Sequence, residues 1–294
     1  VLGSVDALTA PWFARARFTQ ARQGFRMAED AATALGDEAR EARYAYLLAK
    51  AHLRQDDYGT ARQLLEKAIG VFQPMNDLPR LADAYVDLAD VAFEQAEFGE
   101  AGGSLAAANV IYQELHQPVG IATVKCRQAH IAYVEDRDDD ARRLCEEGLD
   151  SLPPGDGAIV RSRTLRLLTD LALRSRQLDE AADYCQQAQV ANQVVNDPTE
   201  SAAILYAQAK LDHFLGERTA ALANALRSAQ LYATMGDRKA TAIVYHTISH
   251  IHVAASDSAA AQAAAEYGLT LAQALDDADL IELFQSQIDT INQA

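Results

Sequence analysis

Residues 36–76, GDEAREARYAYLLAKAHLRQDDYGTARQLLEKAIGVFQPMN, decide the fold because their apolar and small side chains recur every three or four positions. That spacing places them on one face of a helix. A polar turn at residues 55–59 divides the stretch into two such helices, and Pro74 and Asn76 end the second one. The stretch is therefore predicted to form a helical hairpin.

The same register of small residues returns every 40 residues along the chain. Seven alanines occupy one position of it, namely Ala21, Ala61, Ala101, Ala141, Ala181, Ala221 and Ala261. A fixed period of this length indicates a tandem array of one supersecondary unit. Small side chains let two helix axes approach to about 8 Å rather than 10 Å. We therefore expect these alanines near the start of the second helix of each hairpin, where the two helices pack closely.

Each unit has three small positions, separated by twelve and then seven residues, as in Ala49, Ala61 and Ala68. This spacing resembles the tetratricopeptide repeat. The resemblance implies an all-α fold, a right-handed superhelical α-solenoid of antiparallel helix hairpins. The family's usual repeat has about 34 residues, whereas this one has 40. Longer repeats of this kind resemble those of MalT-like transcriptional regulators, Rap-type receptors for peptide pheromones and the sensory halves of some bacterial diguanylate cyclases.

We expect residues 1–294 to form a single solenoid. Its predicted parts are a half repeat without a preceding partner helix at 12–34, full repeats at 37–76, 77–117, 118–156, 157–196, 197–236 and 237–276, and a capping helix at 278–293. The irregular linker LPPGDG at residues 152–157 must shorten the second helix of its unit. Residues 153–157 are then either a hinge or a looser turn in a continuous array.

The charge of the chain limits its partners. A net charge of -16 opposes approach to nucleic acid or to an anionic membrane surface, and a neutral or basic protein or peptide is favoured. No apolar run approaches the roughly 18 residues needed to span a bilayer, and the opening residues lack the pattern of a secretory signal. We expect a cytoplasmic protein. The sequence leaves homodimerisation open.

Catalytic motifs are missing from the sequence. No nucleophile elbow, phosphate-binding loop or zinc-protease pattern is present, so we expect no enzymatic activity, no catalytic residues and no cofactor. The acidic run from Asp136 to Glu147 has the spacing of a calcium-binding loop. Such a loop needs Gly at its sixth position, where this chain has Ala141. We therefore interpret the run as a solvated turn.

Metal and disulfide chemistry have weak signals. His246 and His250 are four residues apart and could share a zinc ion, but no third ligand completes the set. We predict no metal site. Cys145 and Cys185 occupy equivalent repeat positions on an apolar stripe and are expected to be buried thiols. A bridge between them is the alternative.

One column of the first helices is polar in all six units, whereas a core column would be apolar. This face therefore meets solvent or a ligand. Interleaved aromatic and charged side chains along it favour binding. The predicted partner-binding residues of this concave groove are Arg43, Tyr46, Lys50, Arg54, Asp90, Glu94, His130, Arg163, Arg166, Asp170, Tyr206, Lys210, His246 and His250.

The resulting functional prediction is a protein- or peptide-binding scaffold that forms part of a bacterial regulatory or signalling protein. Replacing Arg166 and Lys210 together by Glu should then weaken the binding of the partner. The alternative is a sensory domain that binds a small molecule or signal peptide and controls an attached effector, either a transcription factor or a diguanylate cyclase.

Overall fold

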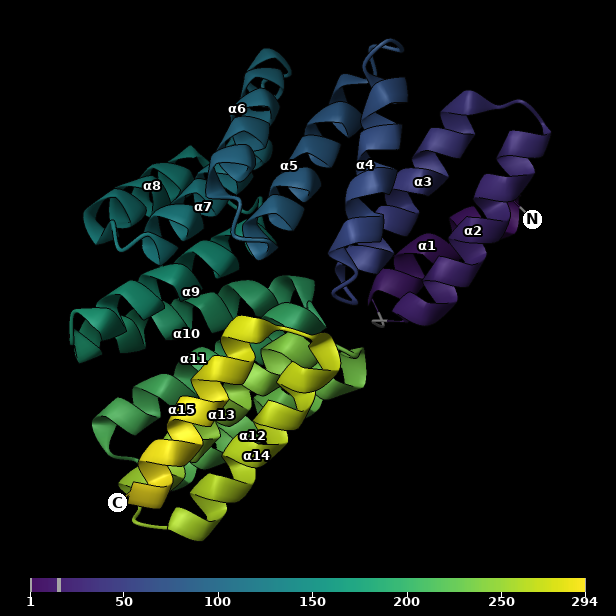
Figure 1. The fold of residues 1–294 in the computed structure, drawn as a ribbon. Helices are drawn as coiled ribbons and strands as arrows, with labels where there is room; N and C mark the ends of the chain where they lie inside the picture. The colour runs from purple at the N-terminus through teal and green to yellow at the C-terminus, as the bar shows by residue number, and fades with distance from the viewer. Residues whose placement is uncertain (1, 15–16, 294) are drawn as a thin grey trace. The chain divides into compact units, whose positions relative to one another are not determined.

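The computed structural model describes residues 2–14 and 17–293, and all regular secondary structure in these ranges is α-helical (Figure 1). The all-α prediction is confirmed. The helices of these ranges are α1 (Leu2–Ala14), α2 (Phe18–Ala34), α3 (Glu38–Leu53), α4 (Tyr58–Phe72), α5 (Leu78–Glu94), α6 (Phe98–Glu114), α7 (Pro118–Val134), α8 (Asp138–Ser151), α9 (Ala158–Arg174), α10 (Leu178–Val195), α11 (Pro198–Leu215), α12 (Arg218–Met235), α13 (Arg238–Ala254), α14 (Ser258–Leu275) and α15 (Ala278–Gln293).

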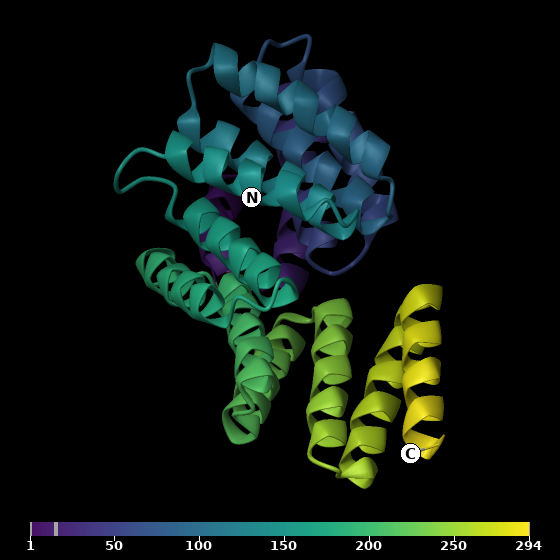
Figure 2. The same ribbon diagram turned by 90° about the vertical axis from the view of Figure 1, so that its left-hand side faces the viewer.

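Helices that follow one another in the chain pack as antiparallel hairpins. The pairs α3 with α4, α5 with α6, α7 with α8, α11 with α12 and α13 with α14 each form one repeat. The second helix of one pair also packs on the first helix of the next, as α4 does on α5 and α12 on α13. Figure 2 shows α13, α14 and α15 side by side in this way, coloured green to yellow.

The turns between helices have a period of 20 residues. At nearly every turn, one residue has the left-handed backbone conformation. These residues are Gly36, Asp56, Asn76, Ala96, His116, Asp136, Arg176, Asn196, Gly216, Gly236, Ser256 and Asp276. An aspartate follows many of them and caps the next helix, as when Asp57 Oδ1 accepts from the amide of Thr60 at 3.3 Å. The hairpin is therefore built from two helix-and-turn units of equal length.

Ala96 occupies one of these left-handed turns, with φ of 59°. A side chain costs about 1 kcal/mol in this conformation, and glycine avoids that cost. We expect Ala96→Gly to raise the free energy of unfolding by about 0.5 to 1 kcal/mol, measured by urea unfolding. The same substitution at Ala106, an exposed position inside α6, should lower it by about 1 kcal/mol. A loss of stability at both positions would contradict this account of the turns.

All seven framework alanines are completely buried. Each lies in the first turn of a second helix, as predicted, from Ala21 in α2 to Ala261 in α14. In the last hairpin, the hydroxyl of Ser249 on α13 donates to the carbonyl oxygen of Ala261 at 2.8 Å. The two helices therefore approach closely at the small positions, which leaves no room for a larger side chain there.

The chain divides into two compact units, residues 1–164 (unit 1) and 165–294 (unit 2). Large side chains such as Phe72 and Leu105 fill the core of unit 1, and Phe284 is fully buried in unit 2. The boundary falls inside α9, shortly after the irregular linker. As predicted, the linker shortens the preceding helix, because α8 has 14 residues and is the shortest second helix in the described part of the chain. A hinge at residues 153–157 stays a prediction.

The structure differs from the prediction at the N-terminus. We expected the half repeat at 12–34 to lack a partner helix, but α1 precedes α2 and packs on it, with Val5 buried against Phe25. At the other end, α15 spans the expected residues 278–293 and buries Leu280, Phe284 and Ile291 against the last hairpin. None of the described helices combines the length and apolar character needed to cross a membrane.

Candidate functional site

The predicted groove residues lie on or next to the first helices of both units, and they form one face in each unit. In unit 1 the face consists of residues on α3, α5 and α7 (the unit 1 face). In unit 2 it consists of residues on α9 from position 165, α11 and α13 (the unit 2 face). Arg54 caps the end of α3. Arg163 lies on the part of α9 that belongs to unit 1, and it is half-buried.

Ion pairs join successive first helices across the unit 1 face. Lys50 Nζ on α3 lies 3.4 Å from Asp87 Oδ2 on α5. Asp90 on α5 pairs with Arg127 on α7, with 2.5 Å from Nε to Oδ1 and 2.8 Å from Nη2 to Oδ2. Asp87 and Arg127 lie outside the predicted columns, so the sequence pattern did not identify them. Each precedes a predicted residue by three positions, and this spacing places it on the same side of the helix.

The aromatic groups of the unit 1 face have different exposures. The ring of His130 stacks on Phe93, with centroids 4.6 Å apart, and both residues are half-buried. The hydroxyl of Tyr58 lies 3.4 Å from Glu94 Oε2. Tyr46 differs from the prediction because it is only 8 % exposed, with its ring against Phe72. Its ring therefore belongs to the core, while its hydroxyl accepts a bond from Lys50.

The unit 2 face is also tied together by charged groups. Arg166 Nε on α9 lies 3.1 Å from Glu200 Oε1 on α11, and Glu200 is only 3 % exposed. Asp170 on α9 accepts from Lys210 Nζ on α11 at 2.5 Å. The ammonium group of Lys210 also lies 4.7 Å from the centre of the Tyr206 ring. The two ion pairs connect α9 with α11.

The ion pairs change how binding on this face must be tested. Replacing Arg166 and Lys210 by Glu would set two new carboxylates beside Glu200 and Asp170. Removing one partner of a buried pair is already strongly destabilising. The double charge reversal would therefore disrupt unit 2, and a loss of binding would not identify the face as the site.

Histidines gather on the unit 2 face. The rings of His246 and His250 lie 4.5 Å apart, edge to face. The Nδ1 atom of His213 on α11 is buried and has no hydrogen-bond partner among the described residues. No group of three or more metal-ligating side chains occurs in the described parts of the chain, and the cysteines Cys126, Cys145 and Cys185 are buried free thiols.

Burial and the neighbouring His250 lower the pKa of His246 to about 4. In the unfolded chain, the His pKa is about 6.5. Between pH 4 and pH 6.5 the unfolded chain therefore binds more protons than the folded one. Stability from this group is complete above pH 6.5 and is lost as the pH falls toward 4. We expect this group to lower the free energy of unfolding by about 1 to 2 kcal/mol between pH 7 and pH 5. In the His246→Gln variant, the decrease over the same pH range should be smaller by this amount. Equal pH slopes for both proteins would contradict the assignment.

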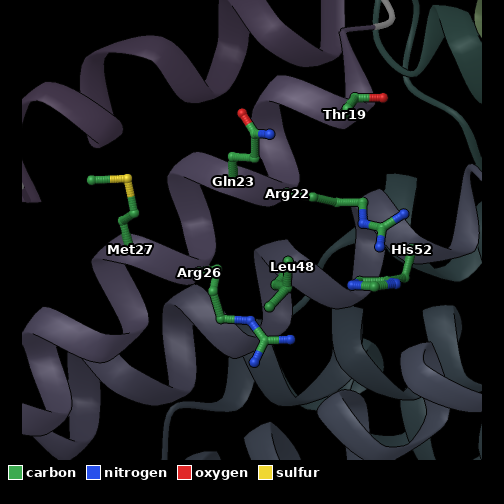
Figure 3. A pocket seen from close by; sticks show the side chains of 7 residues that line it. All are labelled: Thr19, Arg22, Gln23, Arg26, Met27, Leu48 and His52. Atoms are coloured by element: carbon green, nitrogen blue, oxygen red, sulfur yellow. The ribbon is translucent and has the colours of Figure 1, made fainter.

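A second cluster lies in unit 1, away from the predicted groove. An open pocket of about 580 Å³ lies between α2 and α3 (Figure 3). Its lining consists of Thr19, Arg22, Gln23, Arg26, Met27, Leu48 and His52. Leu48 and His52 are each two positions from a face residue, Tyr46 or Lys50, so they lie on nearly the opposite side of α3. The repeat register and the polar column did not indicate this pocket.

No protein-family model matches the chain, and no curated protein matches its sequence. Solved structures match its fold. A Rap protein complexed with Competence and Sporulation Factor has a TM-score of 0.76 and 12% identity, and the match covers 92% of this chain and 74% of that chain. The Rap conjugation gene regulator of plasmid pLS20 in complex with the Phr* peptide has a TM-score of 0.75 and 10% identity, covering 91% and 72%.

A third match is aspartyl phosphate phosphatase F from Bacillus subtilis, with a TM-score of 0.68 and 12% identity, covering 93% of this chain and 69% of that chain. At these identities the similarity shows the fold alone. It confirms the resemblance to Rap-type repeats that the 40-residue period indicated. The chain thus has the fold of paired antiparallel helices, similar to the tetratricopeptide repeat, that is found in Rap proteins.

Proposed function

We propose that the chain is a regulatory scaffold that binds a protein or peptide on the first-helix face of one of its units. The observation that carries this proposal is the composition of those faces. Lys50, Asp87, Asp90 and Arg127 in unit 1 are charged side chains held in place by inter-helix pairs. Such pre-positioned groups bind a partner with little loss of side-chain entropy.

The neighbouring side chains suit a peptide. The stacked rings of Phe93 and His130 offer an aromatic contact in unit 1. In unit 2, Phe214 on α11 is 43% exposed and offers an aromatic ring. Aromatic side chains are among those that contribute most binding energy at protein interfaces. The negative net charge favours a neutral or basic partner.

The comparisons support the same proposal. Two of the similar structures are Rap proteins solved with a bound factor or peptide, and one of these proteins is a conjugation gene regulator. This second fact also supports the alternative, a sensory domain that controls an effector. In that case the ligand on the face is a signal peptide or small molecule, and its binding changes the activity of an attached domain.

The experiment selects binding peptides from a random fifteen-residue display library and measures their dissociation constants by calorimetry. One variant per unit tests the face without breaking an ion pair, with Arg54→Glu in unit 1 and Phe214→Ala in unit 2. The matched controls are Arg227→Glu and Leu226→Ala, which change exposed side chains on the second helix α12. We expect one face variant to weaken binding at least tenfold and both controls to stay within twofold. Unchanged affinity in both face variants would refute the proposal.

Absence of enzymatic activity stays a prediction, because one structure of similar fold is an aspartyl phosphate phosphatase. Its test is phosphate release from an aspartyl-phosphate substrate by the intact chain. We expect the background rate. A rate that falls in a face variant would instead assign a catalytic role to the face.

A further inference from the structure

The N-terminal part of this acidic chain is locally basic. Residues 7–28 contain the four arginines Arg15, Arg17, Arg22 and Arg26 and no Asp or Glu, although the whole chain has a net charge of -16. Arg22 and Arg26 are one helical turn apart on α2, and both line the pocket between α2 and α3. Positive charge is therefore concentrated at one cavity of unit 1.

These two arginines differ from many Lys and Arg side chains in the described part of the chain. Arg62, Lys67 and Arg127, for example, each pair with a carboxylate of a neighbouring helix. Within residues 2–14 and 17–293, neither Arg22 nor Arg26 has a carboxylate partner. Arg22 and Arg26 are like charges four positions apart on α2, and this spacing is unfavourable on a helix. An anion bound in the pocket would offset both charges.

Neutral contacts hold the cationic side of the pocket in place. Arg22 Nη1 donates to Gln55 Oε1 at 2.8 Å, and Gln55 Nε2 donates in turn to Thr19 Oγ1 at 3.2 Å. This chain of bonds fixes Arg22 without neutralising it. Figure 3 shows Arg22 and Arg26 extending from α2 on the side where α3 presents Leu48 and His52.

His52 completes the polar lining. It is only 4% exposed, and its Nδ1 lies 2.8 Å from Asp57 Oδ2. Asp57 also caps α4 through the amide of Thr60, so this carboxylate is already engaged. The contact with Asp57 orients the imidazole and leaves Nε2 as its second polar atom. Among the described residues, those that line the pocket include no carboxylate.

We propose that the pocket between α2 and α3 binds a small phosphate-bearing molecule, with the phosphate held by Arg22 and Arg26 and oriented by His52 and Thr19. Guanidinium groups match phosphate oxygens in charge and in their forked geometry. The volume of about 580 Å³ exceeds what a bare phosphate needs and lies in the usual range for small organic ligands. Met27, which is 59% exposed, and the edge of the otherwise buried Leu48 provide an apolar lining for the organic part.

The experiment uses the intact chain and measures binding by calorimetry with phenyl phosphate, inorganic phosphate and benzoate. The ring signals of His52 are followed by NMR to locate the ligand. We expect phenyl phosphate to bind at least tenfold more tightly than benzoate and to shift the His52 signals. Tighter binding of benzoate, or no shift at His52 with either phosphate compound, would overturn the proposal. Equal affinity for inorganic and phenyl phosphate would refute the apolar part of the site.

Variants separate a specific site from general attraction of anions. The double variant Arg22→Gln with Arg26→Gln should bind phenyl phosphate at least tenfold more weakly. The control Arg218→Gln with Arg227→Gln removes the same charge from exposed positions of α12 and should change affinity less than twofold. Arg22 also bonds to Gln55, so the double variant could unfold. In that case the single variant Arg26→Gln is used, and we expect its affinity for phenyl phosphate to fall at least threefold. Equal losses in pocket and control variants would refute the site.

Discussion

Replacing Ala261 by Leu is expected to lower the free energy of unfolding by about 3 kcal/mol, the upper part of the range for overpacked cores. Ala261 is fully buried in the first turn of α14. Ser249 on α13 reaches its carbonyl oxygen at 2.8 Å, so the added carbons can be placed only by separating the two helices. Chemical unfolding followed by circular dichroism measures the effect.

The control for this substitution is Ala263→Leu, two residues further along α14 at an exposed position. Its side chain extends into solvent, and we expect a change below about 0.5 kcal/mol. If both variants were equally stable, the framework alanines would not be the positions where the hairpin helices pack most closely. The register derived from them would then lose its structural basis.

Replacing Arg127 by Met is expected to cost about 2 to 3 kcal/mol, because hydrogen bonds to charged groups contribute about 1.5 to 3 kcal/mol. The guanidinium contacts both carboxylate oxygens of Asp90, and each side chain is only 23% exposed. Removing it leaves a half-buried carboxylate without its counter-charge. The same unfolding assay measures the loss.

A double-mutant cycle identifies the cause of this loss. Adding Asp90→Met to Arg127→Met should restore at least half of the stability, because no charge then remains without a partner. The control is Arg80→Met, which removes a surface pair with Asp77 and should cost less than about 1 kcal/mol. A double variant less stable than Arg127→Met alone would contradict the role of the pair.

The repeat architecture could be predicted from sequence because packing imposes a strict requirement on it. A small residue must recur wherever two helices cross closely, and the 40-residue spacing of the alanines records that requirement. Helix α1 was missed for the corresponding reason. Residues 2–14 have no small-residue register and contain Pro11, so no repeat pattern marks them as part of the array.

The candidate sites were harder to predict because they depend on pairs of residues distant in sequence. The polar column identified Lys50 and Asp90, but their partners Asp87 and Arg127 are defined only when neighbouring helices are placed side by side. The pocket between α2 and α3 combines Arg22 with His52 from another helix. The available signal was the run of 22 residues, 7–28, that has arginines and no acidic residue.

Photo-cross-linking tests the proposed binding face most directly. A peptide selected from the display library is synthesised with a benzophenone side chain, irradiated with the intact chain, and the attachment points are found by mass spectrometry. We predict attachment to first helices, near His130 on α7 or near His250 on α13. Attachment confined to the second helices α4, α6, α12 and α14 would contradict the account.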